Sequence, residues 1–179
     1  MVLVFLANGF EEIEALATVD LLRRAELDVT TVGIGGRLIR GSHGITVVAD
    51  VEEDQFSMYG VDAIVLPGGL PGTLNLEKSE VVQGVIDYAV ENRLLIAAIC
   101  AAPSILGHKG LLAGKAATCF PGYEQELTDA VISPDVVAVD GSYITAKGAG
   151  ASIPFALAII SRLVSPEQAK RLEASLQCR

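Results

Sequence analysis

Short apolar runs that alternate with helical patterns constrain the fold of this chain more than any other feature of its sequence. Each run is four to six residues long, and several are rich in β-branched residues. Runs of this kind are typical of strands buried on both faces, as in a parallel sheet. The predicted strands are Val2–Ala7, Val29–Ile34, Ala63–Leu66, Leu94–Ile99, Ala116–Cys119, Val136–Val139 and Tyr143–Ala146.

Helices are predicted between and after these strands. Apolar residues recur at spacings of three and four over Glu12–Ala25 and Glu80–Asn92, which places them on one face of each helix. The segment Ala151–Val164 is apolar on nearly all sides, so we expect it to be covered on two sides. Pro166 is suited to begin a terminal helix that runs to about Leu176. This alternation predicts an α/β fold with a doubly wound, mostly parallel sheet sandwiched by helices.

Composition and charge set the size of the fold and exclude several classes of function. The chain has 179 residues, of which 51% are hydrophobic, and no linker or repeat divides it, so a single domain is expected over residues 1–179. The stretch Gly33–Gly44 is read as a small hairpin excursion within it. The formal net charge is −9 and Lys and Arg form no cluster, which argues against nucleic acid and against anionic membranes as partners.

No segment is predicted to cross a membrane or to direct export. The longest nearly apolar stretch, Leu94–Leu106, is interrupted by Pro103 and is shorter than a membrane-spanning helix. The first residues lack the basic region and the length of a signal peptide, so a cytoplasmic location is expected. The cysteines Cys100, Cys119 and Cys178 form no CxxC pair, which is consistent with reduced thiols in that compartment.

Cys100 is the strongest candidate for a reactive residue. A buried strand ends at Ile99 and a helix is predicted to begin near Pro103, so Cys100 lies in a tight strand-to-helix turn. This turn lies at the carboxyl end of a strand, where open α/β sheets bind their ligands. Amides at the start of the helix would favour a thiolate and could bind an oxyanion. An inert core cysteine is the alternative interpretation.

Two further strand ends could contribute to the same site. Glu14 lies on the flank of the first helix that could turn toward the end of the sheet, whereas Glu11 and Glu12 are read as an acidic first turn that offsets the helix dipole. Leu66-Pro67-Gly68-Gly69 follows the third strand, and its glycines allow backbone amides to approach a ligand. Its spacing matches neither a dinucleotide-binding motif nor a P-loop.

The two histidines are not expected to take part in this chemistry. His108 follows Cys100 in the predicted helix and would stand about 12 Å along its axis, so it is expected to cap the helix end instead. His43 is expected on the hairpin in a structural or surface role. Their separation, without CxxC or HExxH spacing, argues against a metal site.

Four segments in combination resemble the ThiJ/PfpI superfamily, in the branch of the parkinsonism-associated protein deglycase. The resemblance covers nearly the whole chain, and it implies a flavodoxin-like α/β sandwich related to class I glutamine amidotransferase domains, normally assembled as a homodimer. The segments are Glu11-Glu12-Ile13-Glu14, Leu66-Pro67-Gly68-Gly69, Ala97-Ala98-Ile99-Cys100-Ala101-Ala102-Pro103 and Lys147-Gly148-Ala149-Gly150.

The resemblance also implies roles for individual residues. Cys100 would be the reactive cysteine and Glu14 its carboxyl partner. The backbone amides of Gly69 and Ala101 would form an oxyanion or sulfinate pocket, and Arg24 would lie near a pocket entrance lined by the dimer.

The chain departs from the superfamily at three positions. The protease-like branch has a histidine directly after its cysteine, where this chain has Ala101, so a peptidase is not expected. The deglycase's histidine falls in a Thr-x-His-Pro segment that aligns with Thr118–Pro121, so Phe120 replaces it and a carboxyl group must do the proton work. Cys119 is expected either beside the pocket or as an ordinary strand residue. His43 stands near the place of a pocket arginine that is frequent in the family.

Cys100 and Glu14, if within hydrogen-bond distance, would form a coupled pair that carries one negative charge. We expect the charge on sulfur and the proton on Glu14, which could then act as general acid and later as base. A glyoxalase or deglycase fits this chemistry, because a small α-oxoaldehyde can pass through a hemithioacetal and an enediol to a 2-hydroxy acid with no metal or organic cofactor. The alternatives are a cysteine oxidation sensor or stress chaperone without significant turnover, and a hydrolase or amidotransferase-like enzyme of unknown substrate.

Overall fold

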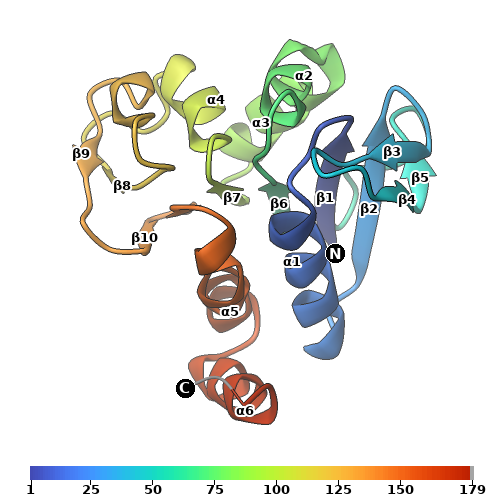
Figure 1. Cartoon of the computed structure of the whole chain (residues 1–179). Coiled ribbons are helices and arrows are strands. Elements are labelled where there is room, and N and C mark those ends of the chain that lie inside the picture. The colour runs from blue at the N-terminus through green and yellow to red at the C-terminus, as the bar shows by residue number, and fades with distance from the viewer. Residues whose placement is uncertain (178–179) are drawn as a thin grey trace.

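A seven-stranded sheet forms the centre of the computed structural model, which describes residues 1–177 (Figure 1). The strand order is β10-β11-β7-β6-β1-β2-β5, and every neighbouring pair is parallel except β10 and β11. The mostly parallel, doubly wound sheet predicted from the sequence is therefore confirmed. Its strands are β1 (Val2–Ala7), β2 (Val29–Ile34), β5 (Val51–Glu52), β6 (Ala63–Leu66), β7 (Leu95–Ile99), β10 (Val137–Asp140) and β11 (Tyr143–Ala146).

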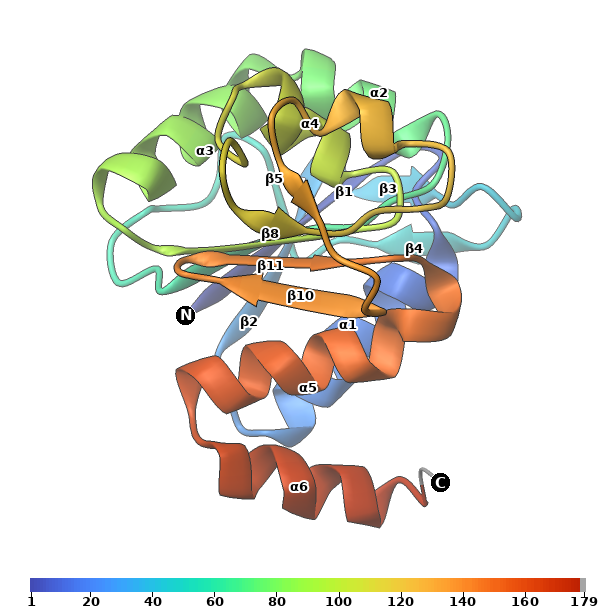
Figure 2. The same cartoon turned by 90° about the vertical axis from the view of Figure 1, so that its left-hand side faces the viewer.

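Helices cover both faces of the sheet, and two hydrophobic cores result (Figures 1 and 2). Alternate residues of β1 show the division, because Val2, Val4 and Leu6 pack into one core while Leu3 and Phe5 pack into the other. The helices of the first core are α1 (Glu12–Arg24), α5 (Ser152–Leu163) and α6 (Pro166–Ser175), and those of the second are α2 (Gly72–Lys78), α3 (Glu80–Glu91) and α4 (Pro103–His108).

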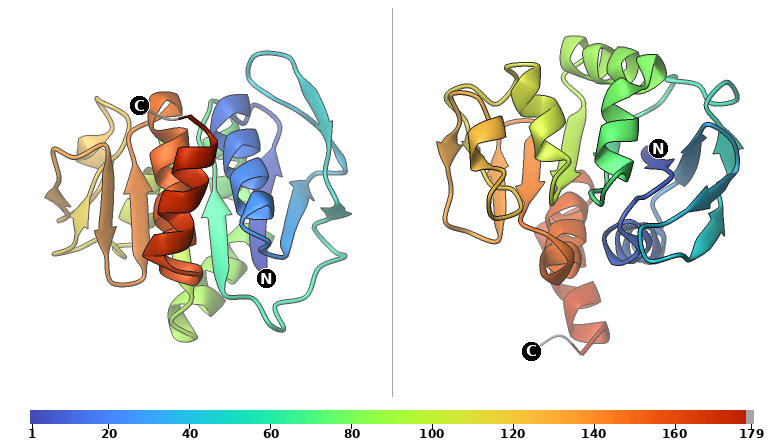
Figure 3. Two further views of the ribbon diagram at one scale, coloured as in Figure 1. Left: turned by 90° about the horizontal axis from the view of Figure 1, so that it is seen from below. Right: turned by 45° about the horizontal axis from the view of Figure 1, so that its top comes forward.

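On the face of the sheet that carries the first core, part of the helical layer is covered by a further helix. Helix α5 packs against α1 and the sheet, and α6 packs on the far side of α5 (Figure 2). Seen from below, in the left panel of Figure 3, the red helix α6 therefore lies in front of α5. The nearly all-round apolar character predicted for α5 fits this position, because Phe155, Ile159 and Ile160 are fully buried.

Smaller elements surround the sheet. The predicted hairpin excursion consists of β3 (Leu38–Arg40) and β4 (Thr46–Val48), which pair antiparallel. A separate pair joins β8 (Ala116–Ala117) and β9 (Val131–Ile132), and the 3-10 helices are η1 (Glu124–Glu126) and η2 (Ala149–Ala151). No helix within residues 1–177 has the length and apolar character needed to cross a membrane.

Two strand predictions need correction. The segment Ala116–Cys119 was expected in the buried sheet, but only Ala116–Ala117 is a strand and it pairs with β9 alone. The apolar run reflects burial without strand pairing in the main sheet. The Thr118 amide, for example, donates to the side-chain hydroxyl of Thr145 and not to a backbone carbonyl of a neighbouring strand. The segment Val136–Val139 was expected to be buried on both faces, but β10 is an antiparallel edge strand whose Val139 is exposed.

Candidate active site

The backbone turns sharply at Cys100, which directly follows β7. Cys100 has a φ of +65°, a left-handed conformation that is uncommon for a residue with a side chain. The turn is fixed by hydrogen bonds from the Cys100 amide to the carbonyl of Ala146 (2.9 Å) and from the Phe120 amide to the carbonyl of Cys100 (2.8 Å). Helix α4 begins three residues later with Pro103 in its first turn. The thiol is half-buried at the carboxyl end of the sheet.

Backbone amides from two strand ends surround the sulfur. The backbone N–H groups of Gly69, after β6, and Ala101, after β7, lie beside the sulfur of Cys100, where they favour the anionic form and oppose the rise of the thiol pKa. Gly69 has a φ of +90°, and a side chain there would collide with the backbone of Gly9 and Glu11. The structure thus brings the two predicted amides to Cys100, where they could also bind an oxyanion.

Glu14 reaches the same place from the first turn of α1. Its own N–H donates to the side chain of Glu11, which caps the helix, at 2.7 Å. The carboxyl is only 1% exposed, and its Oε2 accepts a hydrogen bond from the N–H of Gly68 at 2.9 Å. A Cβ placed on Gly68 would lie 2.5 Å from the Cβ of Cys100 and 2.7 Å from Oε2 of Glu14. The absence of a side chain at position 68 therefore lets carboxyl and cysteine lie together.

Burial raises the pKa values of both acids in this pair. It raises the pKa of Glu14 to about 7, the charge of Glu11 adds to the rise, and the contacts with Cys100 and the Gly68 amide oppose it. Burial, together with the adjacent carboxyl group of Glu14, raises the pKa of the Cys100 thiol to about 12, although the amides of Gly69 and Ala101 oppose the rise. These shifts favour Glu14 as the charged member of the pair above pH 7.

Burial of the pair opposes the resting thiolate beside a protonated carboxyl that was expected from the sequence, and that expectation stays a prediction for the titration of Cys100. The amides at the helix start are present, but desolvation of the sulfur and the adjacent carboxylate outweigh them. A carboxylate with a pKa near 7 is well matched to accept the thiol proton during attack. Glu14 then holds that proton and can donate it to the substrate.

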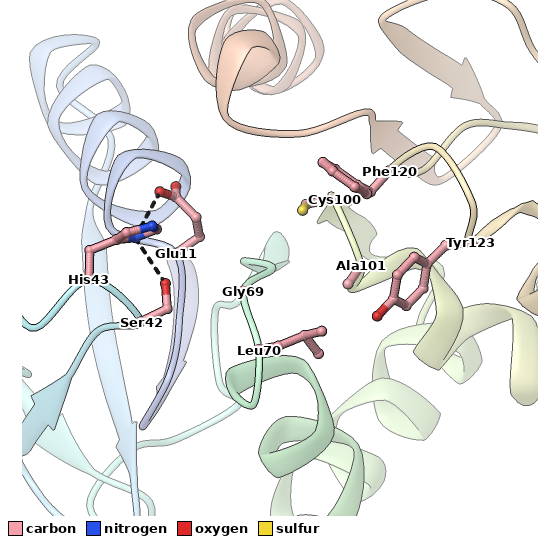
Figure 4. A pocket seen from close by; sticks show the side chains of 9 residues that line it. All are labelled: Glu11, Ser42, His43, Gly69, Leu70, Cys100, Ala101, Phe120 and Tyr123. Carbon is pink, nitrogen blue, oxygen red and sulfur yellow. Dashed lines mark hydrogen bonds and ion pairs between the residues drawn. The ribbon is translucent and has the colours of Figure 1, made fainter.

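A cavity of about 310 Å³ opens in front of Cys100 (Figure 4). In the figure His43, Ser42 and Glu11 form one wall, Cys100, Ala101, Phe120 and Tyr123 form the opposite wall, and Gly69 and Leu70 lie between them. An adjoining cavity shares four of these residues and extends to Glu14. Phe120, expected near the pocket, therefore lines it directly.

Two other residues considered for the pocket do not line these cavities of the single chain, and the dimer-lined entrance expected near Arg24 stays a prediction. Arg24 lies in the last turn of α1 and forms an exposed ion pair with Asp20 at 2.7 Å. Cys119 is 3% exposed and packs into the second core, whereas Cys100 contacts the first, so the two thiols belong to opposite faces of the sheet. Burial raises the pKa of Cys119 to about 11. Cys178 lies outside the described residues.

His43 lies at the site, where its ring lines both cavities together with Cys100. The residues alone indicated a surface or structural role, and only the family resemblance placed His43 near a pocket arginine. The available signal was the hairpin itself, which follows the carboxyl end of β2 and so lies at the same edge of the sheet as Cys100. His108, by contrast, does not cap its own helix but contacts Glu77 and Glu126.

Glu12 also differs from its expected role in an acidic, water-facing first turn. It is 4% exposed, and its carboxylate accepts hydrogen bonds from the loop that carries His43. Glu11, Glu12 and His43 form the one group within residues 1–177 whose ligand atoms lie close enough together, within 4.8 Å, to hold a metal ion. Both oxygens of Glu12 already accept hydrogen bonds, so the local structure is complete as it stands.

Comparisons with known proteins agree with this architecture. Residues 1–162 match the model of the DJ-1/PfpI family. Protein DJ-1 homolog B of Arabidopsis thaliana is 39% identical over 96% of this chain, and the chain spans 40% of the length of that plant protein. A Caenorhabditis elegans protein named glutathione-independent glyoxalase DJR-1.2 is 32% identical over 90% of this chain and 87% of its own length.

The solved structures give the same result at the level of the fold. The structure titled Toxoplasma gondii DJ-1, oxidized, is 34% identical and superposes with a TM-score of 0.94 over 98% of this chain and 97% of its own. This similarity extends over the flavodoxin-like sheet and both helical layers, in agreement with the resemblance of the sequence motifs. The chain belongs to the DJ-1/PfpI family.

Proposed function

We propose that the protein is a cofactor-independent cysteine enzyme of the glyoxalase or deglycase type, which acts on small α-oxoaldehydes or their protein adducts. The observation that carries this proposal is the burial of the Glu14 carboxyl against Cys100, which raises the pKa of Glu14 to about 7. A base of this strength beside a half-buried thiol is what addition of sulfur to an aldehyde requires at neutral pH.

The first step is addition of Cys100 to the aldehyde. Glu14 accepts the thiol proton while the sulfur bonds to the aldehyde carbon, and the developing oxyanion accepts hydrogen bonds from the amides of Gly69 and Ala101. Glu14 then returns the proton to that oxygen. The product is a hemithioacetal, and no proton is gained or lost overall.

The second step moves hydrogen from one carbon of the substrate to the next. Glu14, again ionised, removes the proton from the carbon bonded to sulfur, which gives an enediolate, and then returns this proton to the neighbouring carbon. The hydroxyl proton passes from the first oxygen to the second, so no proton is gained or lost. The former aldehyde carbon is now the carbonyl carbon of a thioester with Cys100. Hydrolysis of this thioester releases a 2-hydroxy acid and restores the thiol.

The cavity and the relatives support this substrate class. A volume of about 310 Å³ suits a molecule of a few carbon atoms, and the cavity opens to solvent, so an adduct on a protein side chain could also enter it. The name of the Caenorhabditis elegans relative assigns a glyoxalase activity without glutathione to that protein.

The proposal is tested by following lactate formation from methylglyoxal by the purified protein without thiol or metal. The wild type is expected to form lactate, and Cys100→Ala and Glu14→Gln are expected to form none above the uncatalysed rate. Cys119→Ala is the matched control and is expected to keep the activity, because that thiol faces the other core. Lack of turnover by the wild type would overturn the proposal.

A sensor of oxidation is the second candidate, and one observation favours it. Cys100 is half-buried at an open cavity, whereas Cys119 is almost fully buried, so oxidants can reach the first thiol selectively. Glu14 in its protonated form could donate a hydrogen bond to an oxidised sulfur. In this role, or in that of a stress chaperone, turnover of carbonyl compounds would be incidental.

A homodimer is also proposed, because apolar side chains are exposed beside the pocket. Ile13 and Leu16 of α1 and Ile153 of α5 are 58%, 37% and 38% exposed. Helices α1 and α5 pack against each other, so these side chains could be covered by a second copy. Sedimentation equilibrium tests this, with Ile13→Glu expected to shift the protein toward the monomer.

A further inference from the structure

His43 and Glu12 form a carboxylate–imidazole pair that the proposed reaction does not yet use. The Nδ1 atom of His43 lies 3.0 Å from Oε2 of Glu12, and the backbone N–H of His43 donates to Oε1 of the same carboxylate at 2.8 Å. The Ile45 amide and the Ser42 hydroxyl also donate to Glu12, at 3.3 Å each. Backbone and ring of His43 are therefore both fixed relative to α1.

The carboxylate of Glu12 determines which ring nitrogen of His43 carries the proton and which one is free to act as a base. Hydrogen bonds from His43 and from the loop amides outweigh the effect of burial and hold the pKa of Glu12 below its usual value, so Glu12 is ionised at neutral pH. An ionised carboxylate only accepts hydrogen bonds, so Nδ1 must carry the proton. In the neutral ring Nε2 then has its lone pair free, and no group in the described chain bonds to it.

The position of His43 complements that of Glu14. Glu14 is 1% exposed and contacts the sulfur side of the site, so it is poorly placed to activate a water molecule from solvent. The His43 side chain is 72% exposed and forms the cavity wall opposite Cys100 (Figure 4). Among the residues that line the two cavities, His43 is the only imidazole and no lysine or arginine is present.

We propose that His43, held by Glu12, is the general base that activates water to hydrolyse the acyl group on Cys100. Water attacks the thioester carbonyl carbon while Nε2 of His43 accepts its proton, and the oxyanion accepts hydrogen bonds from the amides of Gly69 and Ala101. Collapse of this intermediate breaks the carbon–sulfur bond and gives a carboxylic acid and the Cys100 thiolate. The proton of the acid passes through Glu14 to the sulfur, which leaves a carboxylate product and restores the thiol. His43 passes its proton to solvent, and no oxidant or reductant is required.

This inference rests on the proposed function for the natural thioester, but a small activated ester tests it separately. With p-nitrophenyl acetate, acylation of Cys100 releases a burst of p-nitrophenolate, and hydrolysis of the acetyl thioester sets the later steady rate. The variant His43→Gln is expected to keep the burst amplitude and to lower the steady rate about 10²-fold or more, within the range that general bases contribute. At a time when the wild type has lost the acetyl group from Cys100, mass spectrometry is expected to find this group still present on Cys100 of His43→Gln.

Control variants separate this role from a structural one. His108→Gln removes the other histidine, which contacts Glu77 and Glu126 and lines neither cavity at Cys100, and it is expected to leave both phases unchanged. Glu12→Gln is expected to slow only the steady phase, because Glu12 acts by positioning His43. Cys100→Ala is expected to lack the burst.

Several results would overturn the assignment. These are an unchanged steady rate in His43→Gln, a lost burst in that variant, or the absence of a Cys100-dependent burst in the wild type. Methylglyoxal turnover is measured in parallel. A biphasic ester reaction without methylglyoxal turnover would overturn the proposed function and leave the role of His43 in place.

Discussion

The N–H of Gly68 donates a hydrogen bond of 2.9 Å to Oε2 of Glu14, and this bond holds the carboxyl beside Cys100. Three segments far apart in the sequence meet here, because β1, β6 and β7 are neighbours in the sheet and end at the same edge. The chemistry of the site follows from this meeting, since burial of Glu14 in the crowded junction raises its pKa to about 7.

Activity is expected to depend on the ionisation of Glu14. Burial raises the pKa of Glu14 to about 7 in the folded protein, so the fraction of Glu14 in the carboxylate form increases as the pH rises through that value. We predict that kcat/KM for methylglyoxal rises between pH 6 and pH 8 and that Glu14→Gln abolishes both the rise and most of the activity. Initial rates across this range check the prediction, and a flat wild-type profile would contradict it.

The stability of the fold is also expected to depend on the ionisation of Glu14, but it falls as the pH rises, whereas the activity increases. Below pH 4.5, the ordinary value for a glutamic acid, Glu14 is protonated in both states. As the pH rises to about 7, the unfolded chain releases the proton while the folded chain keeps it, so the free energy of unfolding falls, by about 3 kcal/mol. Glu14→Gln lacks this loss. In urea denaturation, the free energy of unfolding of Glu14→Gln minus that of the wild type is expected to be larger at pH 8 than at pH 5. A difference that does not change with pH would contradict the raised pKa of Glu14.

Gly68→Ala is expected to damage the site without any change of charge. A Cβ at this position would lie 2.5 Å from the Cβ of Cys100, 2.7 Å from Oε2 of Glu14 and 2.8 Å from the carbonyl oxygen of Ile99. The last contact is with backbone, so the strain cannot be relieved by a side-chain rotation alone, and a cost of about 1–3 kcal/mol is expected. Gly84→Ala is the control, because a Cβ there meets no atom within 4 Å. Equal activity in the two variants would count against the close packing of the pair.

Oxidation is expected to be selective for Cys100 over Cys119. Cys119 is 3% exposed and lines neither cavity at Cys100, whereas Cys100 faces the cavity and has Glu14 as a base. Peptide mass spectrometry after mild peroxide treatment is expected to find two added oxygen atoms on Cys100 first. Equal oxidation of Cys119 at the earliest times would contradict the burial argument.

His108 is expected to make a small, pH-dependent contribution to stability. Contacts with Glu77 and Glu126 raise its pKa, so its contribution is complete below the ordinary histidine value and is lost as the pH rises through the folded value. The side chain is 41% exposed, which limits the effect to less than about 1 kcal/mol. Thermal melts of His108→Gln are expected to differ from the wild type more at pH 5.5 than at pH 8.5. The reverse order would contradict the assigned contacts.

Much of the sheet could be predicted from the sequence because burial on both faces leaves an unbroken apolar run. The bounds of β1, β2, β6 and β11 match their predicted runs residue for residue. The same signal failed at Ala116–Cys119, where apolar residues are buried in the second core without pairing in the main sheet. Helix α2 was not predicted, since its seven residues follow two glycines and a proline and lack a side-chain cap.

The site could be predicted only in part, for a related reason. The turn at Cys100 was visible as a strand running directly into a helix, and it has the strained φ that such a turn requires. Glu12 and His43 could not be paired from the sequence, because their contact depends on the hairpin folding back onto α1. The proton distribution between Glu14 and Cys100 depends on burial, which spacing does not reveal.

The coupling between Glu14 and Cys100 is tested most directly by the pH dependence of Cys100 alkylation with iodoacetamide. In the wild type the alkylation rate is expected to rise through about pH 7, as Glu14 becomes able to accept the thiol proton. In Glu14→Gln the same rise is expected only at alkaline pH, near the ordinary range of a thiol. An identical pH profile in the two proteins would contradict the account.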